Sequence, residues 1–229
     1  MIEKIVDDGD YFEIHASWAT SIVCAFARLD GQVVGIVANK PASLAGVLDI
    51  HALEKAARFV QSCDAFSVPL ITPVDVPGFL PGSEQEHGGI IRHGAKLLYA
   101  YCNATVPRIQ VILRKAYGGS YIDMDSRSIG VDLSFAWPIN EIAITGAEGA
   151  ANVVFRRKIA AADDAEAVRA QRIKEYRQEL RHPYYAAERG LVDDVIDPAE
   201  TRPVLILALE ALRTKDARLP SGTHGNPPM

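Results

Sequence analysis

The sequence contains no apolar run that approaches the ~20 residues of a membrane-spanning helix. Residues 1–10 are acidic and polar, so they predict neither a secretory signal nor a transit peptide. The formal net charge of −5 argues against a general nucleic-acid binder. We therefore expect no membrane and no nucleic-acid partner. We also expect a cytoplasmic location, or the mitochondrial matrix if the source is eukaryotic.

The spacings that metal sites and disulfide frameworks require are also missing. Cys24, Cys63 and Cys102 lie far apart and form no Cys-x-x-Cys pair, so we expect reduced thiols that pack as small core residues. His87 and His93 fit no common zinc pattern. The sequence therefore predicts no metal on this chain.

No linker divides the chain. Its 229 residues can bury one sizeable core, and a content of 48% hydrophobic and 23% charged residues is ordinary for a globular protein. We expect a single domain over 1–229. Within it, residues 216–229 are expected to form an irregular tail, because their end is rich in Pro and Gly.

The first half of the chain alternates between strand and helix patterns. Two apolar runs flank Asp30-Gly31 and predict a hairpin. A helix is expected from about Asp49 to Cys63, with an apolar face that is made by Leu53, Ala56, Ala57 and Val60. The strands predicted around these elements are Ile22–Leu29, Val33–Ala38 and Val68–Val76.

The pattern continues to the end of the chain and indicates an α/β fold in which helices flank the sheet. Asp75, Glu84 and Glu86 are irregularly spaced and are expected in a solvated loop. The further strands predicted are Ile109–Leu113, Ala136–Thr145 and Leu191–Ile196. The further helices predicted are one from Gly88-Gly89 to Asn103, then Gly146–Phe155, Asp163–Arg181 and Thr201–Arg213, of which Asp163–Arg181 carries an apolar stripe at Val168, Ile173, Tyr176 and Leu180.

The segment Arg114–Tyr121 is the most informative part of the sequence. It follows a buried strand, and Gly118-Gly119 permits a tight turn and close approach of another group. A helix that begins there would present free N–H groups, which suit an oxygen that becomes negative during a reaction. An ordinary glycine turn between a strand and a helix is the alternative interpretation.

Several blocks, taken in order, resemble the carboxyltransferase (beta) subunit of biotin-dependent acyl-CoA carboxylases, such as propionyl-CoA and acetyl-CoA carboxylases. The ordered set covers nearly the whole chain, which makes the resemblance specific. The blocks are Gly35–Asn39, Val74–Gly82, Gly88–Lys96, Arg114–Tyr121, Ala136–Pro138, Gly146–Asn152 and Ala186–Gly190.

This resemblance implies a crotonase-like (ClpP/crotonase) ββα spiral with flanking helices. Members of the family are about twice this length, so the chain resembles their C-terminal, biotin-side domain. The implied partners are an N-terminal carboxyltransferase domain, which binds the acyl-CoA, and the biotin carboxylase/biotin carrier (alpha) subunit. The family also implies a homo-oligomer, a hexamer in its intact form, and a chain that is inactive alone.

The implied reaction moves a carboxyl group from carboxybiotin, held on a carrier protein, to the α-carbon of an acyl-CoA, in fatty acid metabolism. The resemblance therefore implies a ligase that forms C–C bonds. By resemblance, the backbone N–H groups of Gly119 and Ser120 form an oxyanion hole for the biotin ureido oxygen, or alternatively for the thioester oxygen. The substrates supply the proton chemistry, so no side-chain base is needed.

Other residues are candidates for the biotin or substrate site. Ile122 lies where the family shapes its acyl pocket, and core packing is the alternative role. Tyr117 and Tyr121 are expected to wall the site or to pack in the core. The remaining candidates belong to glycine-rich turns and are Gly78, Phe79, Gly82, Gly88, Gly89 and Gly118.

Three other functions remain open. Related biotin-dependent decarboxylases and transcarboxylases share this domain and most of its motifs. A noncatalytic module that docks a biotin carrier could use the same fold. A stand-alone crotonase-type enzyme is disfavoured, because no Glu or Asp lies at the Gly118-Gly119 turn itself to act as acid or base.

Overall fold

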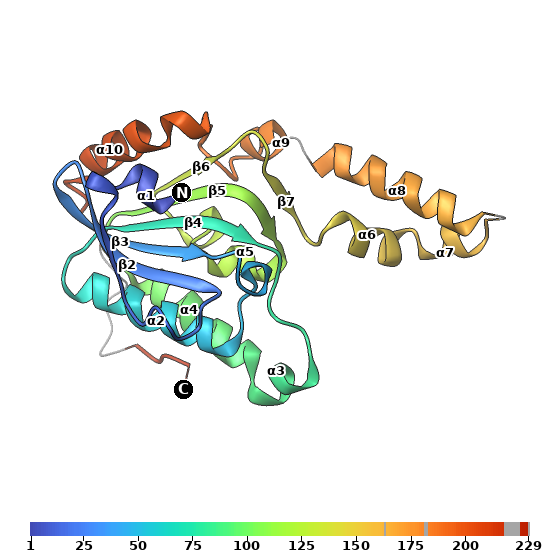
Figure 1. Cartoon of the computed structure of the whole chain (residues 1–229), viewed down its shortest axis with the longest axis horizontal. Coiled ribbons are helices and arrows are strands. Elements are labelled where there is room, and N and C mark those ends of the chain that lie inside the picture. Colours follow the sequence, from blue (N-terminus) through green and yellow to red (C-terminus); the bar gives the residue numbers. More distant parts are fainter. Residues whose placement is uncertain (163, 181–182, 218–224, 229) are drawn as a thin grey trace.

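The computed structural model describes residues 1–162, 164–180, 183–217 and 225–228. They form one eight-stranded sheet with helices on both faces and a helical arm that extends away from it (Figure 1). The strand order is β1-β2-β3-β4-β5-β6-β8, and β7 pairs with the end of β5. This is the crotonase-like α/β arrangement that the sequence predicts.

The strands are β1 Tyr11–Glu13, β2 Ile22–Leu29, β3 Gln32–Asn39, β4 Leu70–Val76, β5 Arg108–Tyr117, β6 Leu133–Ala136, β7 Glu141–Ala143 and β8 Asp194–Val195. The helices are α1 Ile2–Ile5, α2 Ile50–Ala65, α3 Ser83–Gly88, α4 Ile90–Asn103, α5 Gly118–Asp123, α6 Ala147–Val154, α7 Arg156–Ala160, α8 Ala165–Leu180, α9 Pro183–Ala187 and α10 Thr201–Leu212.

The sheet changes character along its width. The β2–β3 hairpin is antiparallel, and Asp30 and Gly31 make its turn with φ values of 52° and 76°, as Asp-Gly in a tight hairpin requires. From β3 onward the neighbouring strands are parallel. All seven residues of β4 are buried, which is typical of a parallel strand covered on both faces.

Two apolar layers hold the helices to the sheet. On one face α2 and α4 pack against β2, β3 and β4, and the four residues predicted for the apolar face of the first long helix are all buried. The carboxylate of Asp49 caps this helix, because its Oδ1 accepts from Ala52 N at 2.7 Å. On the other face α1 and α10 cover the sheet, with Leu205 and Leu209 in the layer (Figure 1).

Several boundaries differ from the predictions. The predicted strand 136–145 is wrong: β6 ends at Ala136, and a turn closed by the Asn140 N to Trp137 O bond precedes β7. Pro138 in that turn has no N–H to donate to a strand ladder. β5 extends to Tyr117, β8 is shorter than predicted, and Ser83–Gly88 forms a helix that was not predicted.

Helices α6, α7 and α8 form the arm, which projects from the sheet beyond β7 (Figure 1). An ion pair between Arg177 and Glu148 ties α8 to α6. The predicted apolar stripe of the long helix is only half-buried at Val168, Ile173 and Tyr176, because a two-layered arm has no enclosed core. Positions 163 and 181 of the predicted helix, and the side chain of residue 180, lie outside the description.

The described ranges also bear on the predictions for membrane spans, cysteines and the tail. No helix in the described ranges is long and apolar enough to cross a membrane. Cys24 and Cys63 are buried as predicted, whereas Cys102 is exposed at the end of α4, so its predicted core position is wrong. The described tail residues 216–217 and 225–228 have no helix or strand, while 218–224 and 229 lie outside the description.

Candidate functional site

The site is built around the bend at which β5 passes into α5. Gly118 begins the helix with a φ of +60°, a conformation that L side chains rarely adopt. A Cβ atom placed on Gly118 would lie 2.9 Å from the Ile144 carbonyl oxygen, which is main chain and cannot rotate away. The first glycine is therefore required for both backbone conformation and space. We call residues Tyr117 to Ser120 the bend.

The first amides of α5 have no side-chain cap among the described residues. The opening N–H groups of an α-helix have no carbonyl four residues earlier, and no side chain in the described part of the protein caps this helix. Gly119 is exposed, whereas the Ser120 side chain is buried and its Oγ donates to the Tyr117 carbonyl oxygen at 2.8 Å. The hydroxyl thus braces the bend, and the amides remain as its donor groups.

The loop that follows β4 provides one wall of the bend. The Cε2 atom of Phe79 would lie 3.4 Å from a Cβ atom placed on Gly119. Leu48 fixes this loop, because its N–H donates to the Gly78 carbonyl at 3.1 Å and its carbonyl accepts from Leu80 N at 2.9 Å. The predicted loop residue Phe79 therefore lies at the bend, Gly78 is held in the same loop by Leu48, and the loop ends at Gly82, which precedes α3.

Gly88 and Gly89, also candidates for the biotin or substrate site, lie where α3 turns into α4. A Cβ atom on Gly88 would lie 2.7 Å from Ile50 Cδ1, and Gly89 has a φ of +83° where α3 turns into α4. Figure 1 places α3 well away from α5. These two glycines allow two helices to turn and pack, and a Cβ atom on either would meet Ile50 or Arg92 rather than a residue of the bend.

The three large side chains around the bend differ in accessibility. Tyr117 is buried, and its hydroxyl donates to the Glu141 carboxylate. The pKa of Tyr117 is raised mainly by burial and further by this hydrogen bond. Tyr121 packs in the α2–α4 core layer, where burial raises its pKa to about 12. Ile122 is 38% exposed. Of the three, only Ile122 presents a largely accessible side chain beside the bend.

Asp75 is not in a solvated loop, so that expectation is wrong. It lies in β4 with 7% exposure, and Arg114 Nη2 is 2.9 Å from its Oδ2. Its Oδ1 also accepts from Lys115 N at 3.2 Å, and its own N–H donates to Asn39 Oδ1 at 3.2 Å. These bonds bridge β3, β4 and β5 at the irregularity after Val74. The sequence showed Arg114 only as part of the glycine motif.

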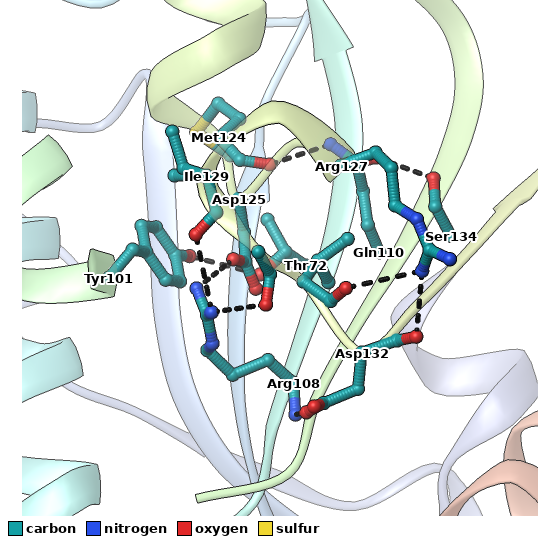
Figure 2. Close-up of polar contacts among 12 residues, drawn as sticks. Thr72, Tyr101, Arg108, Gln110, Met124, Asp125, Arg127, Ile129, Asp132 and Ser134 are labelled. Carbon is teal, nitrogen blue, oxygen red and sulfur yellow. Dashed lines mark hydrogen bonds and ion pairs between the residues drawn. The ribbon is translucent and has the colours of Figure 1, made fainter. Parts of the chain in front are cut away.

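A polar network holds the far end of the segment that starts at the bend (Figure 2). Arg108 Nη1 donates to Asp125 Oδ1 at 2.6 Å, and both side chains are buried. Gln110 Nε2 donates to the Met124 carbonyl at 2.8 Å, and its Oε1 accepts from Ser134 Oγ at 2.7 Å. The network therefore fixes the chain directly after α5 to strands β5 and β6.

Asp123 lies between these two ends, two residues before Asp125, whose carboxyl pKa burial also raises to about 7. It is buried with 7% exposure, and burial raises the pKa of its carboxyl to about 7. No hydrogen bond or ion pair of its carboxyl is found within 1–162, 164–180, 183–217 and 225–228. Sequence reasoning missed this residue, and its only signal there was its position one helical turn after Gly119.

In the described ranges, no three His, Cys, Asp or Glu side chains lie close enough together to hold a metal ion. The donor set at the bend consists of main-chain N–H groups, which bind anions rather than cations. The arrangement can therefore stabilise a negative oxygen next to an apolar wall.

Comparison with known proteins identifies one family. The family described as "Carboxyl transferase domain" matches residues 1–227. The methylmalonyl-CoA carboxyltransferase 12S subunit of Propionibacterium freudenreichii subsp. shermanii is 60% identical over 228 residues. The propionyl-CoA carboxylase carboxyltransferase subunit of Haloferax mediterranei is 53% identical, and the methylmalonyl-CoA decarboxylase subunit alpha of Propionigenium modestum is 52% identical.

Each of these relatives aligns with all of this chain, but the chain spans only 44% of each relative's length. Among solved structures, the transcarboxylase 12S hexamer with methylmalonyl-coenzyme A and methylmalonic acid bound has a TM-score of 0.95 at 60% identity. All of this chain and 44% of that one are covered. The matched region is therefore one part of longer proteins.

Proposed function

This chain belongs to the carboxyl transferase domain family, and we propose that it supplies the biotin-side half of a carboxyltransferase active site. The proposed reaction transfers a carboxyl group between biotin on a carrier protein and the α-carbon of a CoA ester. The observation that carries the proposal is the bend, whose amides have no side-chain cap in the described residues and whose Gly119 is exposed beside an apolar wall.

The donor set fits the biotin ureido group. When bound, carboxybiotin supplies the carboxyl group, and negative charge gathers on its ureido oxygen as that group leaves. A pair of neighbouring main-chain N–H groups, Gly119 and Ser120, suits one such oxygen and needs no reorganisation during the reaction. The ring of Phe79 would exclude water from one side, which strengthens these hydrogen bonds.

The chain's own side chains have positioning tasks rather than proton-transfer tasks. Ser120 Oγ braces the bend from behind, and Gly118 lets the chain pass close to the Ile144 carbonyl. Ile122, accessible one turn into α5, is placed to contact the acyl chain and to influence its length preference. Tyr117 is directed to Glu141 and supports the bend from the side of the arm.

The missing CoA-binding half is proposed to come from an N-terminal carboxyltransferase domain. The related 12S subunit is described as a hexamer assembly with methylmalonyl-coenzyme A bound, and its length is more than twice that matched here. We propose a comparable homo-oligomer, in which this chain contributes the biotin side and a biotin-carrier subunit docks. Alone, the chain should bind biotin weakly and turn over no CoA ester.

Reconstitution tests this proposal. This chain is mixed with an N-terminal half from a 12S-type subunit, a carboxylated biotin carrier and propionyl-CoA or acetyl-CoA, and the carboxylated CoA ester is measured. Product that forms only in the complete mixture supports the proposal. Biotin-carrier binding without product in that mixture indicates a docking module, and turnover by this chain alone indicates a stand-alone enzyme.

A carboxyl exchange between two CoA-linked or keto-acid partners is the second candidate. It is favoured by the 60% identity to the methylmalonyl-CoA carboxyltransferase subunit, against 53% and 52% for the carboxylase and decarboxylase relatives. The same mixture, supplied with methylmalonyl-CoA and an uncarboxylated carrier, distinguishes the direction. Because all three classes can carboxylate the carrier, acetyl-CoA is added without bicarbonate or ATP: malonyl-CoA that forms supports exchange, and free carbon dioxide without a new carboxylated CoA ester supports decarboxylation.

A further inference from the structure

Asp123 is a buried carboxyl group one helical turn after the exposed amide of Gly119. Its exposure is 7%, and the described residues offer its oxygens no cation and no hydrogen-bond donor. Such a site is costly for a charged carboxylate and much less costly for the neutral acid. Burial accordingly raises the pKa of this group to about 7.

The packing around Asp123 links it directly to the bend. A Cβ atom on Gly94 of α4 would lie 3.1 Å from Asp123 Oδ2, so the glycine leaves the space that the carboxyl group fills. The same position on Gly94 is 3.4 Å from Phe79 Cζ, and Phe79 also contacts Gly119. The carboxyl group, the aromatic wall and the start of α5 therefore rest on one spot of α4.

The charged groups on α4 lie near Glu54 or near one another, and buried His93 Nδ1 makes no hydrogen bond within the described residues. On α4, His93 Nδ1 is 3.0 Å from Glu54 Oε1, Lys96 Nζ is 3.3 Å from the same oxygen, and Arg92 Nη2 is 3.4 Å from His93 Nε2. The Cys102 thiol lies further along that helix.

Among the other packed elements, β5 carries Lys115, whose ammonium group has no ion pair in the described ranges. The loop 77–82 has no titratable side chain. On β4, Asp75 is paired with Arg114, and beyond α5 the carboxylate of Asp125 is paired with Arg108. Tyr121 is the other titratable group on α5, and it lies in the core.

We infer that Asp123 is a positioning residue that acts as a neutral acid: its carboxyl group sets the spacing of α5 on α4 and so aims the amides of Gly119 and Ser120. When Asp123 loses its proton, the buried charge draws in water and loosens the α4–α5 contact. The bend, one turn earlier on α5, then loses its fixed direction. This inference deepens the proposed function and rests on it for its catalytic consequence.

The structural part is tested on this chain by NMR. The side-chain carboxyl carbon of Asp123 is titrated from about pH 5 to about pH 9 and assigned by its loss in Asp123→Asn. Over the same range, hydrogen exchange follows the Met124 N–H, which bonds to the Ser120 carbonyl at 3.2 Å and closes α5. Exposed Glu3→Gln serves as the control for a lost carboxylate.

The inference predicts a midpoint near pH 7 and a fall of about tenfold in Met124 protection above it, in wild type and Glu3→Gln. Asp123→Asn and Asp123→Ala should show a smaller fall, and the remainder belongs to Asp125, whose pKa burial also raises to about 7. A carboxyl that titrates with exposed carboxylates, or a fall of undiminished size in both variants, would overturn the inference.

The catalytic part is measured in the reconstituted mixture as kcat against pH. Wild type should lose about tenfold above the same midpoint with KM unchanged, and Asp123→Asn should lose that limb. Identical profiles for both proteins would contradict the inference. Absence of product in every mixture counts against the proposed function instead, and the NMR titration then still decides the role of Asp123.

Discussion

The two ends of the segment from Gly118 to Asp132 are held in opposite ways. At its start, the amides of α5 are uncapped and Gly119 is exposed. At its end, Arg108 donates to Asp125 and also to the Gly130 carbonyl, while its own N–H donates to Asp132 (Figure 2). At the start the helix amides have no side-chain cap in the part of the chain that the structure describes, whereas at the end the polar groups are hydrogen-bonded within the protein.

The comparison shows how a fold can hold uncapped helix amides in a fixed position. Uncapped amides alone would let a six-residue helix fray, because isolated helical turns are unstable. The Arg108 network holds the end of this helix, and Ser120 and Gly118 hold its beginning. The rigidity of the free end therefore comes from the bonds at the satisfied end.

The largest expected effect comes from breaking the satisfied end with Asp125→Ala. This change leaves the Arg108 guanidinium buried without its carboxylate, and breaking a buried pair typically costs about 3–5 kcal/mol of unfolding free energy. Urea denaturation at neutral pH measures the loss. Glu175→Ala, which removes an exposed pair with Arg172, should leave the midpoint nearly unchanged. Equal stability of the two variants would contradict this account of the network.

Gly118→Ala attacks the free end and should act mainly on activity. Its Cβ would lie 2.9 Å from the Ile144 oxygen at a φ of +60°, so the bend must shift and its amides with it. A misdirected oxyanion donor costs roughly a hundredfold to a thousandfold in kcat.

Gly119→Ala is the matched control, since its Cβ meets only the Phe79 ring at an ordinary 3.4 Å. We expect less than about a tenfold loss for it in the reconstituted assay. A result in which the second glycine is the more sensitive would show that the bend is constrained differently from the structure.

Asp123→Asn tests the region between the two ends through stability. The folded-state pKa is about 7 against an ordinary value of 3.8, so the folded chain binds the proton more tightly than the unfolded chain. The wild type should therefore lose stability as pH rises from about 4 to about 7, on the order of 2–4 kcal/mol. Asp123→Asn should lack this contribution, while Asp125, whose pKa burial also raises to about 7, keeps its own.

Thermal unfolding of both proteins across that range measures the difference. The stability of the variant relative to the wild type should rise steadily as pH approaches neutral. Above neutral pH this difference should stay constant. A gap between the proteins that is largest in acid would reverse the sign and refute the raised pKa.

The smallest effect is expected for Ser120→Ala. It removes one buried hydroxyl and its 2.8 Å bond to the Tyr117 carbonyl, which is worth about 1 kcal/mol. Both ends of the segment keep their amides and ion pair, so kcat should change by less than about fivefold. Denaturant midpoints and the reconstituted assay together measure this. Complete loss of activity would mean that the hydroxyl contacts substrate.

The sequence sufficed for the elements whose patterns are local. The Asp30-Gly31 hairpin and the helix capped by Asp49 follow from turn chemistry and helical spacing, and both are confirmed. The break between β6 and β7 is not predicted, because the apolar residues of 136–145 together resemble one strand, although Pro138 interrupts them.

The site was only partly predictable for the same reason. Gly118-Gly119 marked the bend, yet only the position of the Ile144 carbonyl shows that the first glycine is the constrained one. Asp75 and Asp123 owe their burial to partners distant in sequence, Arg114 and Gly94. Such contacts leave no periodic trace in a single chain.

A crystal structure of the reconstituted assembly with a biotinylated carrier tests the central claim most directly. The quantity to measure is the distance from the ureido oxygen of biotin to the backbone nitrogens of Gly119 and Ser120. Our account predicts about 3 Å to both. Biotin bound elsewhere, or amides of these two residues engaged by other protein groups, would contradict it.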